Sequence, residues 1–95
     1  MDVSSPVPSR GGEPGNAVKR ADKAVYYHAH AELRLHQRGV DKSQVAKALR
    51  SPDSERSASR PGATRLEKAL SRRRRLAVIA VESRDSFLVL SAFWI

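Results

Sequence analysis

Residues 76–81 read LAVIAV and residues 87–95 read FLVLSAFWI, with the polar segment ESRDS (82–86) between them. Continuous apolar, β-branched and aromatic runs of this length, separated by a turn-forming segment, are typical of strands that are buried on at least one face. This stretch therefore predicts a β-hairpin at the core of the domain. Because an isolated hairpin is only marginally stable in water, we expect helices elsewhere in the chain to cover one of its faces.

Two helical segments precede the hairpin. Residues 24–27 (AVYY) are β-prone and lead directly into a predicted helix over residues 28–37. Gly39 stands where a residue in the left-handed conformation would end this helix. Asp41, with Gln44 three residues later, resembles a capping box and predicts the start of a second helix. That second segment has apolar residues at the i, i+3 and i+4 positions of a helix: Val45, Ala48 and Leu49.

The segment between the second helix and the hairpin is polar at first and then ambiguous. Pro52 ends the helix, and residues 51–63 contain turn-forming residues typical of an exposed loop. Residues 64–71 fit either a helical turn or a strand, and we interpret them as a strand. The predicted fold is therefore α+β, with two N-terminal helices packed on a small antiparallel sheet of about three strands.

Composition separates a leader from a single domain. Residues 1–22 are rich in Pro and Gly at their start and have almost no large apolar side chain, so we expect a flexible leader followed by one domain over residues 23–95. Eighteen Lys and Arg residues against ten Asp and Glu give a formal net charge of +8. Such a charge favours polyanionic partners, although it can also serve solubility alone.

Several classes of protein and site are disfavoured by the sequence. The chain has no cysteine, which excludes disulfides, thiolate zinc sites and a cysteine nucleophile. It has no apolar run near the roughly 20 residues that span a bilayer, and its N-terminus does not resemble a secretory signal. We therefore expect a cytoplasmic protein without membrane attachment. No glycine-rich phosphate loop or Ser-His-Asp ordering is present, and we expect no cofactor.

A basic row on the first predicted helix is the main candidate for a functional site. His30, Arg34, Gln37 and Arg38 lie at i, i+4, i+7 and i+8, which places them on one narrow face of a helix. Two guanidiniums beside an imidazole suit a phosphate, because Arg supplies fixed charged donors and His exchanges a proton near neutral pH. The alternative is an ordinary solvated helix face.

A second candidate is the arginine run that precedes the hairpin. If residues 72–75 are extended, alternate side chains of Arg72, Arg73, Arg74 and Arg75 point to opposite faces, which suits contacts to phosphates. A solubilising strand margin explains the run equally well. Ser91 is the one hydroxyl within the last apolar run, where it either faces a site or bonds locally.

The other histidines and the aromatic residues receive simpler interpretations. His28 and His30 look like a metal pair, but no third ligand stands at a recognisable spacing, so we predict no metal site and assign no role to His28 or His36. Phe87, Phe93 and Trp94 could stack on bases, yet core packing is the better interpretation for aromatics in a C-terminal strand.

The motif of the first helix resembles a bacterial and phage family of uncharacterised small domains. The matching residues are HAELR at 30–34, QRGVD at 37–41, then Val45, Ala48, Leu49 and Pro52, with LSAF at 90–93 in the last strand. The family pattern is His-Ala, an Arg four residues after the His, Arg-Gly-Ile/Val, a polar cap and a short helix. The resemblance covers roughly residues 24–95. This family in turn resembles ribonuclease toxins of the RelE, barnase, EndoU and colicin types.

The resemblance implies a toxin-type, metal-independent ribonuclease-like domain that binds RNA and can cleave it. It implies a site lined by His30, Arg34 and Arg38, with Arg60, Lys68 and Ser91 contributing from the loop and the sheet. It also implies an antitoxin or immunity protein as a partner. The alternative that the residues leave open is a non-catalytic module that uses the same basic face to bind RNA or a protein.

Overall fold

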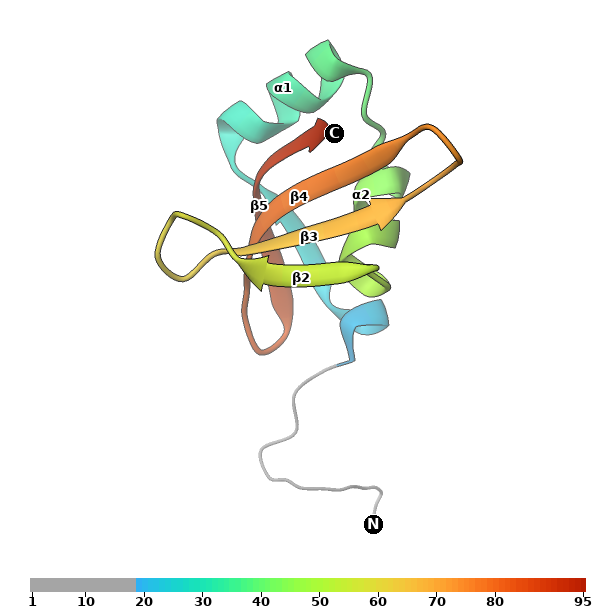
Figure 1. Cartoon of the computed structure of the whole chain (residues 1–95). Helices are drawn as coiled ribbons and strands as arrows, with labels where there is room; N and C mark the ends of the chain where they lie inside the picture. Colours follow the sequence, from blue (N-terminus) through green and yellow to red (C-terminus); the bar gives the residue numbers. More distant parts are fainter. Residues whose placement is uncertain (1–18) are drawn as a thin grey trace.

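The computed structural model describes residues 19–95, so the first 18 residues of the predicted leader lie outside the described part of the chain (Figure 1). The elements in chain order are the 3-10 turn η1 (Arg20–Asp22), β1 (Ala24–Tyr27), α1 (Ala29–Arg38), α2 (Lys42–Arg50), β2 (Ser54–Ser57), β3 (Thr64–Ala69), β4 (Arg75–Glu82) and β5 (Ser86–Trp94).

These residues form an α+β fold with two α-helices and one five-stranded mixed sheet, so the predicted antiparallel sheet of about three strands is wrong. The strand order is β1-β5-β4-β3-β2. β1 runs parallel to β5, with Ala24 opposite Ser86 and Tyr27 opposite Val89. The pairs β2–β3, β3–β4 and β4–β5 are antiparallel.

The two strands that the sequence did not predict, β1 and β2, lack the long apolar runs that mark β4 and β5. All four residues of β2 are exposed and polar, so this strand has no apolar alternation and lies inside the segment predicted as a loop. Its ladder to β3 and an ion pair from Arg56 to Glu67, with 3.0 Å between Nη2 and Oε2, hold it on the sheet. β1 is β-prone, but its partner β5 is distant in the sequence, and local patterning does not reveal a parallel pairing.

The helices and the three central strands follow the predicted pattern closely. α1 begins after His28 and ends at Gly39, which has φ 67° and so adopts the left-handed conformation that glycine favours. The Gln44 Oε1 atom accepts a hydrogen bond from the Asp41 backbone N–H at 2.9 Å, as the capping-box pattern predicts. The described part of the chain contains no helix long and apolar enough to cross a membrane.

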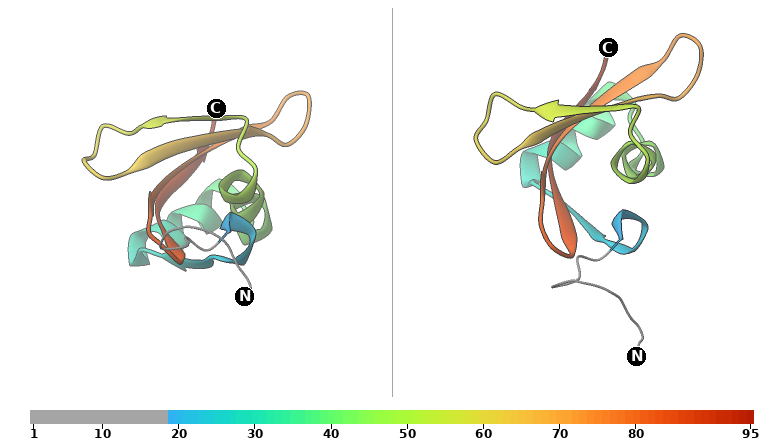
Figure 2. Two further views of the ribbon diagram at one scale, coloured as in Figure 1. Left: turned by 90° about the horizontal axis from the view of Figure 1, so that it is seen from below. Right: turned by 60° about the horizontal axis from the view of Figure 1, so that its bottom comes forward.

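The core lies between one face of the sheet and the two helices. α1 buries Ala31 and Leu35 and packs on β5, while α2 packs on β3 and β4. The largest side chains that are fully buried are Phe87, Leu49, Leu66, Leu76, Val45, Val78 and Val89. Figure 2 shows both helices on the same side of the sheet, so the described elements leave its other face without a helix.

An ion-pair network attaches η1 to the sheet. The Arg20 guanidinium donates to both carboxylate oxygens of Glu55, at 2.8 and 2.7 Å, and to both of Glu82, at 3.0 and 2.8 Å. The Lys23 Nζ atom also donates to Glu82 Oε2 at 2.9 Å. Hydrogen bonding from Arg20 is the main cause that lowers the pKa of the Glu82 carboxyl to about 2; partial burial opposes it and Lys23 adds to it.

This network predicts a loss of stability in acid. The pKa of Glu82 is lower in the folded chain than its ordinary value of 4.5. The stability that the ionised Glu82 side chain contributes to the fold is therefore fully present above pH 4.5 and is lost as the pH falls towards 2. We expect Glu82→Gln to lower the free energy of unfolding at pH 7 by about 1–2 kcal/mol, after allowance for solvent screening. We also expect the variant to lose less stability than the native chain between pH 4.5 and 2.

Urea unfolding at a series of pH values measures both effects. Asp85→Asn is the matched control, because Asp85 is an exposed carboxylate in the adjacent β4–β5 turn. A Glu82→Gln variant whose pH profile parallels that of the native chain would show that the network does not contribute to acid stability.

Candidate nucleic-acid interface

The basic row predicted on the first helix is present on α1. Ala31 and Leu35 turn inward, and the exposed residues His30, Arg34 and Arg38 lie one turn apart along the adjoining face. This arrangement follows from the sequence spacing. When Ala31 and Leu35, at i and i+4, face the core, the residues at i−1, i+3 and i+7 lie along the side of the helix next to the sheet. The three side chains therefore share one exposed face.

Arg38 fixes this row beside the free edge of β5. β1 pairs with β5 only as far as Val89, so within residues 19–95 the outer edge of β5 has no strand partner beyond that residue. The Arg38 Nη1 atom donates to the carbonyl oxygen of Ala92 at 2.9 Å and lies 3.5 Å from the Ser91 Oγ atom. Of the candidate site residues, the structure thus brings Arg38 and Ser91 into direct contact.

His28 is a candidate that the sequence interpretation left without a role. The His28 and His30 rings are stacked, with centroids 5.6 Å apart and planes inclined by 26°. The His28 Nδ1 atom accepts the His30 backbone N–H at 3.4 Å, so the residue also acts as the N-cap of α1. The i, i+2 spacing of two histidines at a helix start is the sequence signal that marks this pair.

The arginine run forms the turn between β3 and β4. Arg72, Arg73 and Arg74 are exposed, and Arg74 lies over the Trp94 ring, with 4.0 Å between Cζ and the ring centroid. Trp94 is partly buried against the core, as the core-packing interpretation predicted, and its Nε1 atom donates to the Arg38 carbonyl oxygen at 3.1 Å. Trp94 therefore connects the turn to the C-terminal end of α1, and both basic elements lie at the same end of the sheet.

Arg75 belongs to β4 rather than to the turn, and it faces the carboxylate of Glu67, with 3.3 Å between Nε and Oε1.

Arg60 lies apart from this basic end, whereas Lys68 is near the arginine turn at the end of β3 but is held by other contacts. Arg60 is exposed in the connection between β2 and β3, at the start of β3, whereas the Arg72–Arg74 turn follows its end. The Lys68 Nζ atom donates to the Ser51 carbonyl oxygen at 2.8 Å and lies 3.9 Å from Asp53 Oδ1. The structure does not bring these two residues to the row on α1.

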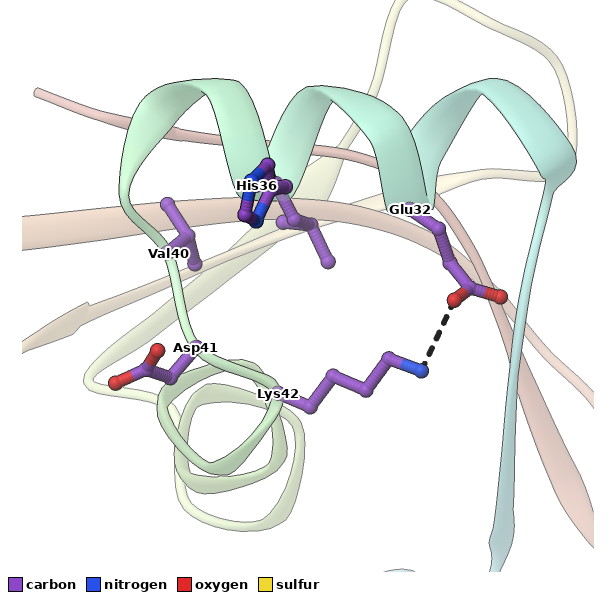
Figure 3. A pocket seen from close by; sticks show the side chains of 6 residues that line it. Glu32, His36, Val40, Asp41 and Lys42 are labelled. Atoms are coloured by element: carbon purple, nitrogen blue, oxygen red, sulfur yellow. Dashed lines mark hydrogen bonds and ion pairs between the residues drawn. The ribbon is translucent and has the colours of Figure 1, made fainter.

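A pocket of about 300 Å³ lies on the other side of α1, between α1 and α2 (Figure 3). Its lining includes Glu32, His36 and Asp41, and the side chains of Glu32 and Lys42 point toward one another across it and form an ion pair of 3.0 Å. His30, Arg34 and Arg38 are not among its lining residues. The pocket and the basic row are thus separate features.

Among residues 19–95 there is no group of three or more His, Asp or Glu side chains arranged to hold a metal ion. Comparison with known proteins gives no match to a family model, to a curated protein or to a solved structure. Function is therefore inferred from the chemistry of the residues on α1, β5 and the arginine turn.

Proposed function

We propose that this chain is a cytoplasmic RNA-binding domain of the metal-independent ribonuclease type, with α1 as its substrate-binding face. The observation that carries the proposal is the pair of contacts that Arg38 makes with Ser91 and Ala92, because they align the basic row with the edge of β5. The stacked pair of His28 and His30 at the start of the row adds two proton-transfer groups. The motif resemblance to small domains related to ribonuclease toxins supports the same function.

The proposed reaction needs no group outside the chain. His30 removes the proton of a ribose 2′-hydroxyl, and the 2′-oxygen attacks the adjacent phosphorus. The bond from phosphorus to the 5′-oxygen breaks, and this oxygen takes a proton from the protonated imidazole of His28, whose Nδ1 atom must first release the His30 backbone N–H that it accepts as the N-cap. The products are a 2′,3′-cyclic phosphate and a free 5′-hydroxyl. Arg34 binds the nonbridging oxygens, on which negative charge accumulates, while Arg38 adds positive charge beside them.

A second candidate function is RNA binding without cleavage. The specific observation in its favour is that Arg38 already donates to a backbone carbonyl and that His28 already caps α1, so both have structural roles. In this case Arg34 and the Arg72–Arg74 turn bind phosphates only. An antitoxin or accessory protein is then a partner that the same basic face could bind.

RNA binding by this face is tested with Arg34→Gln. Arg34 is exposed, so the variant should fold normally while it loses one phosphate contact. We expect weaker binding of a mixed-sequence RNA by roughly five- to tenfold at low salt, and a slope of log affinity against log salt that is smaller by about 1. Fluorescence anisotropy with labelled RNA at several salt concentrations measures both quantities.

The control for this experiment is Arg84→Gln, which removes the same charge from an exposed position in the β4–β5 turn, at the opposite end of β4 from the arginine turn. Equal losses of affinity in the two variants would mean that RNA responds to net charge alone, and the assignment of α1 as the binding face would then be wrong.

A further inference from the structure

The face of the sheet without a helix carries a charged cluster that the basic row does not include. Strand residues two apart share a face, and so do cross-strand partners. By the register, Arg65 lies opposite Ile79 and Glu67 opposite Ala77, while Ile79 and Ala77 lie opposite Ser91 and Phe93. The Arg65 guanidinium accordingly lies over the Phe93 ring, with 5.2 Å between Cζ and the ring centroid. The cluster and Ser91 therefore occupy the same face.

Glu67 is the centre of this cluster. Its side chain is only 11% exposed and accepts hydrogen bonds from Arg65 Nε at 2.7 Å, Arg56 Nη2 at 3.0 Å and Arg75 Nε at 3.3 Å. Hydrogen bonding from Arg65 is the largest cause that lowers the pKa of the Glu67 carboxyl, so the group is ionised at neutral pH. One carboxylate thus orients three guanidiniums.

With respect to residues 19–95, the cluster retains positive charge and free donors. Glu67 neutralises one of the three guanidiniums, and Asp53 lies 3.9 Å from Arg75 Nη1, so the remaining charge resides mainly on Arg56 and Arg65. Each of these two arginines uses one nitrogen for Glu67, whereas a guanidinium has five N–H donors. Their side chains are 67% and 24% exposed, which leaves both accessible to an anion.

The charged cluster and the basic row on α1 are connected through Ser91. Ser91 contacts Arg38 at the edge of β5 and shares the open face with Arg65, which lies two strands away on β3. Neighbouring strands are about 4.8 Å apart, so the distance across β4 is about 10 Å. A polynucleotide bound beside Arg38 and Ser91 can therefore extend over Phe93 to Arg65 and Arg56.

We propose that Arg56 and Arg65, oriented by Glu67, form a second phosphate subsite on the open face of the sheet. This subsite receives a backbone phosphate of the RNA that is bound at α1, so the inference rests on the proposed function. Phe93 holds the Arg65 guanidinium in place through a cation–π contact, and Glu67 is a positioning residue.

The test uses Arg65→Gln and Arg56→Gln, with Arg84→Gln as the control, in binding to a long single-stranded RNA and to a dinucleotide. We expect each subsite variant to bind the long RNA about five- to tenfold more weakly, with a salt slope smaller by about 1. Binding of the dinucleotide, which is too short to reach from α1 across the sheet, should be unchanged. Since Arg56 is two-thirds exposed, its substitution keeps the test valid if Arg65→Gln is poorly folded.

The outcomes separate this inference from the proposed function. If Arg34→Gln weakens binding while both subsite variants bind the long RNA like the native chain, the subsite is refuted and the α1 interface stands. If Arg34→Gln has no effect, the α1 interface itself fails. Equal weakening of dinucleotide and long-RNA binding in the subsite variants would also contradict the proposed path across the sheet.

Discussion

Phe87→Ala is expected to lower the free energy of unfolding by about 3–5 kcal/mol, because it removes a large side chain from a fully buried position. Phe87 stands on β5, between β1 and β4, and the cations of Arg20 and Lys23 lie 6.0 and 5.4 Å from its ring centroid. Native proteins have total stabilities of about 5–15 kcal/mol and a domain this small belongs at the lower end of that range, so this variant should be close to unfolded at room temperature.

Urea unfolding monitored by Trp94, the single tryptophan of the chain, measures this effect. Leu88→Ala is the matched control, because Leu88 is the next residue of β5, is 38% exposed and points to the opposite face. Its loss should be below about 1 kcal/mol. Similar losses for Phe87→Ala and Leu88→Ala would contradict the placement of the core on the helix side of the sheet.

The sequence predicted the parts of the fold that local patterns encode. The two apolar runs of the hairpin became β4 and β5, and Gly39 and the Asp41–Gln44 cap set the helix boundaries at the expected places. It did not predict β2, because four exposed polar residues carry no strand periodicity. It also did not predict the parallel pairing of β1 with β5, which depends on contacts between opposite ends of the domain.

The candidate site shows the same limit. The helical spacing of His30, Arg34 and Arg38 was enough to predict a shared face, because it depends only on α1. The contact of Arg38 with Ala92 joins residues 54 positions apart, and no local pattern encodes it. Lys68 was expected in the site, but it binds the carbonyl oxygen of Ser51. The cluster around Glu67 requires the register of three strands, which the sequence does not provide.

His30→Ala is expected to reduce RNA cleavage by about 10²–10⁴-fold, which is the usual contribution of a positioned proton-transfer group. RNA binding should persist in this variant, because Arg34, Arg38 and the arginine turn are unchanged. A reaction that uses one imidazole as base and the other as acid also requires a bell-shaped dependence of the rate on pH. Substitution of either His28 or His30 should remove one limb of that profile.

The most direct test of the proposed function is cleavage of a mixed-sequence RNA by the purified native protein in EDTA, beside His30→Ala and His36→Ala. His36 is an exposed histidine that lines the pocket on the other side of α1, so its substitution should leave cleavage unchanged. We expect fragments with 2′,3′-cyclic phosphate ends from the native chain and from His36→Ala, and their loss with His30→Ala. Absence of cleavage by the native chain, or equal cleavage by all three proteins, would contradict the proposed function.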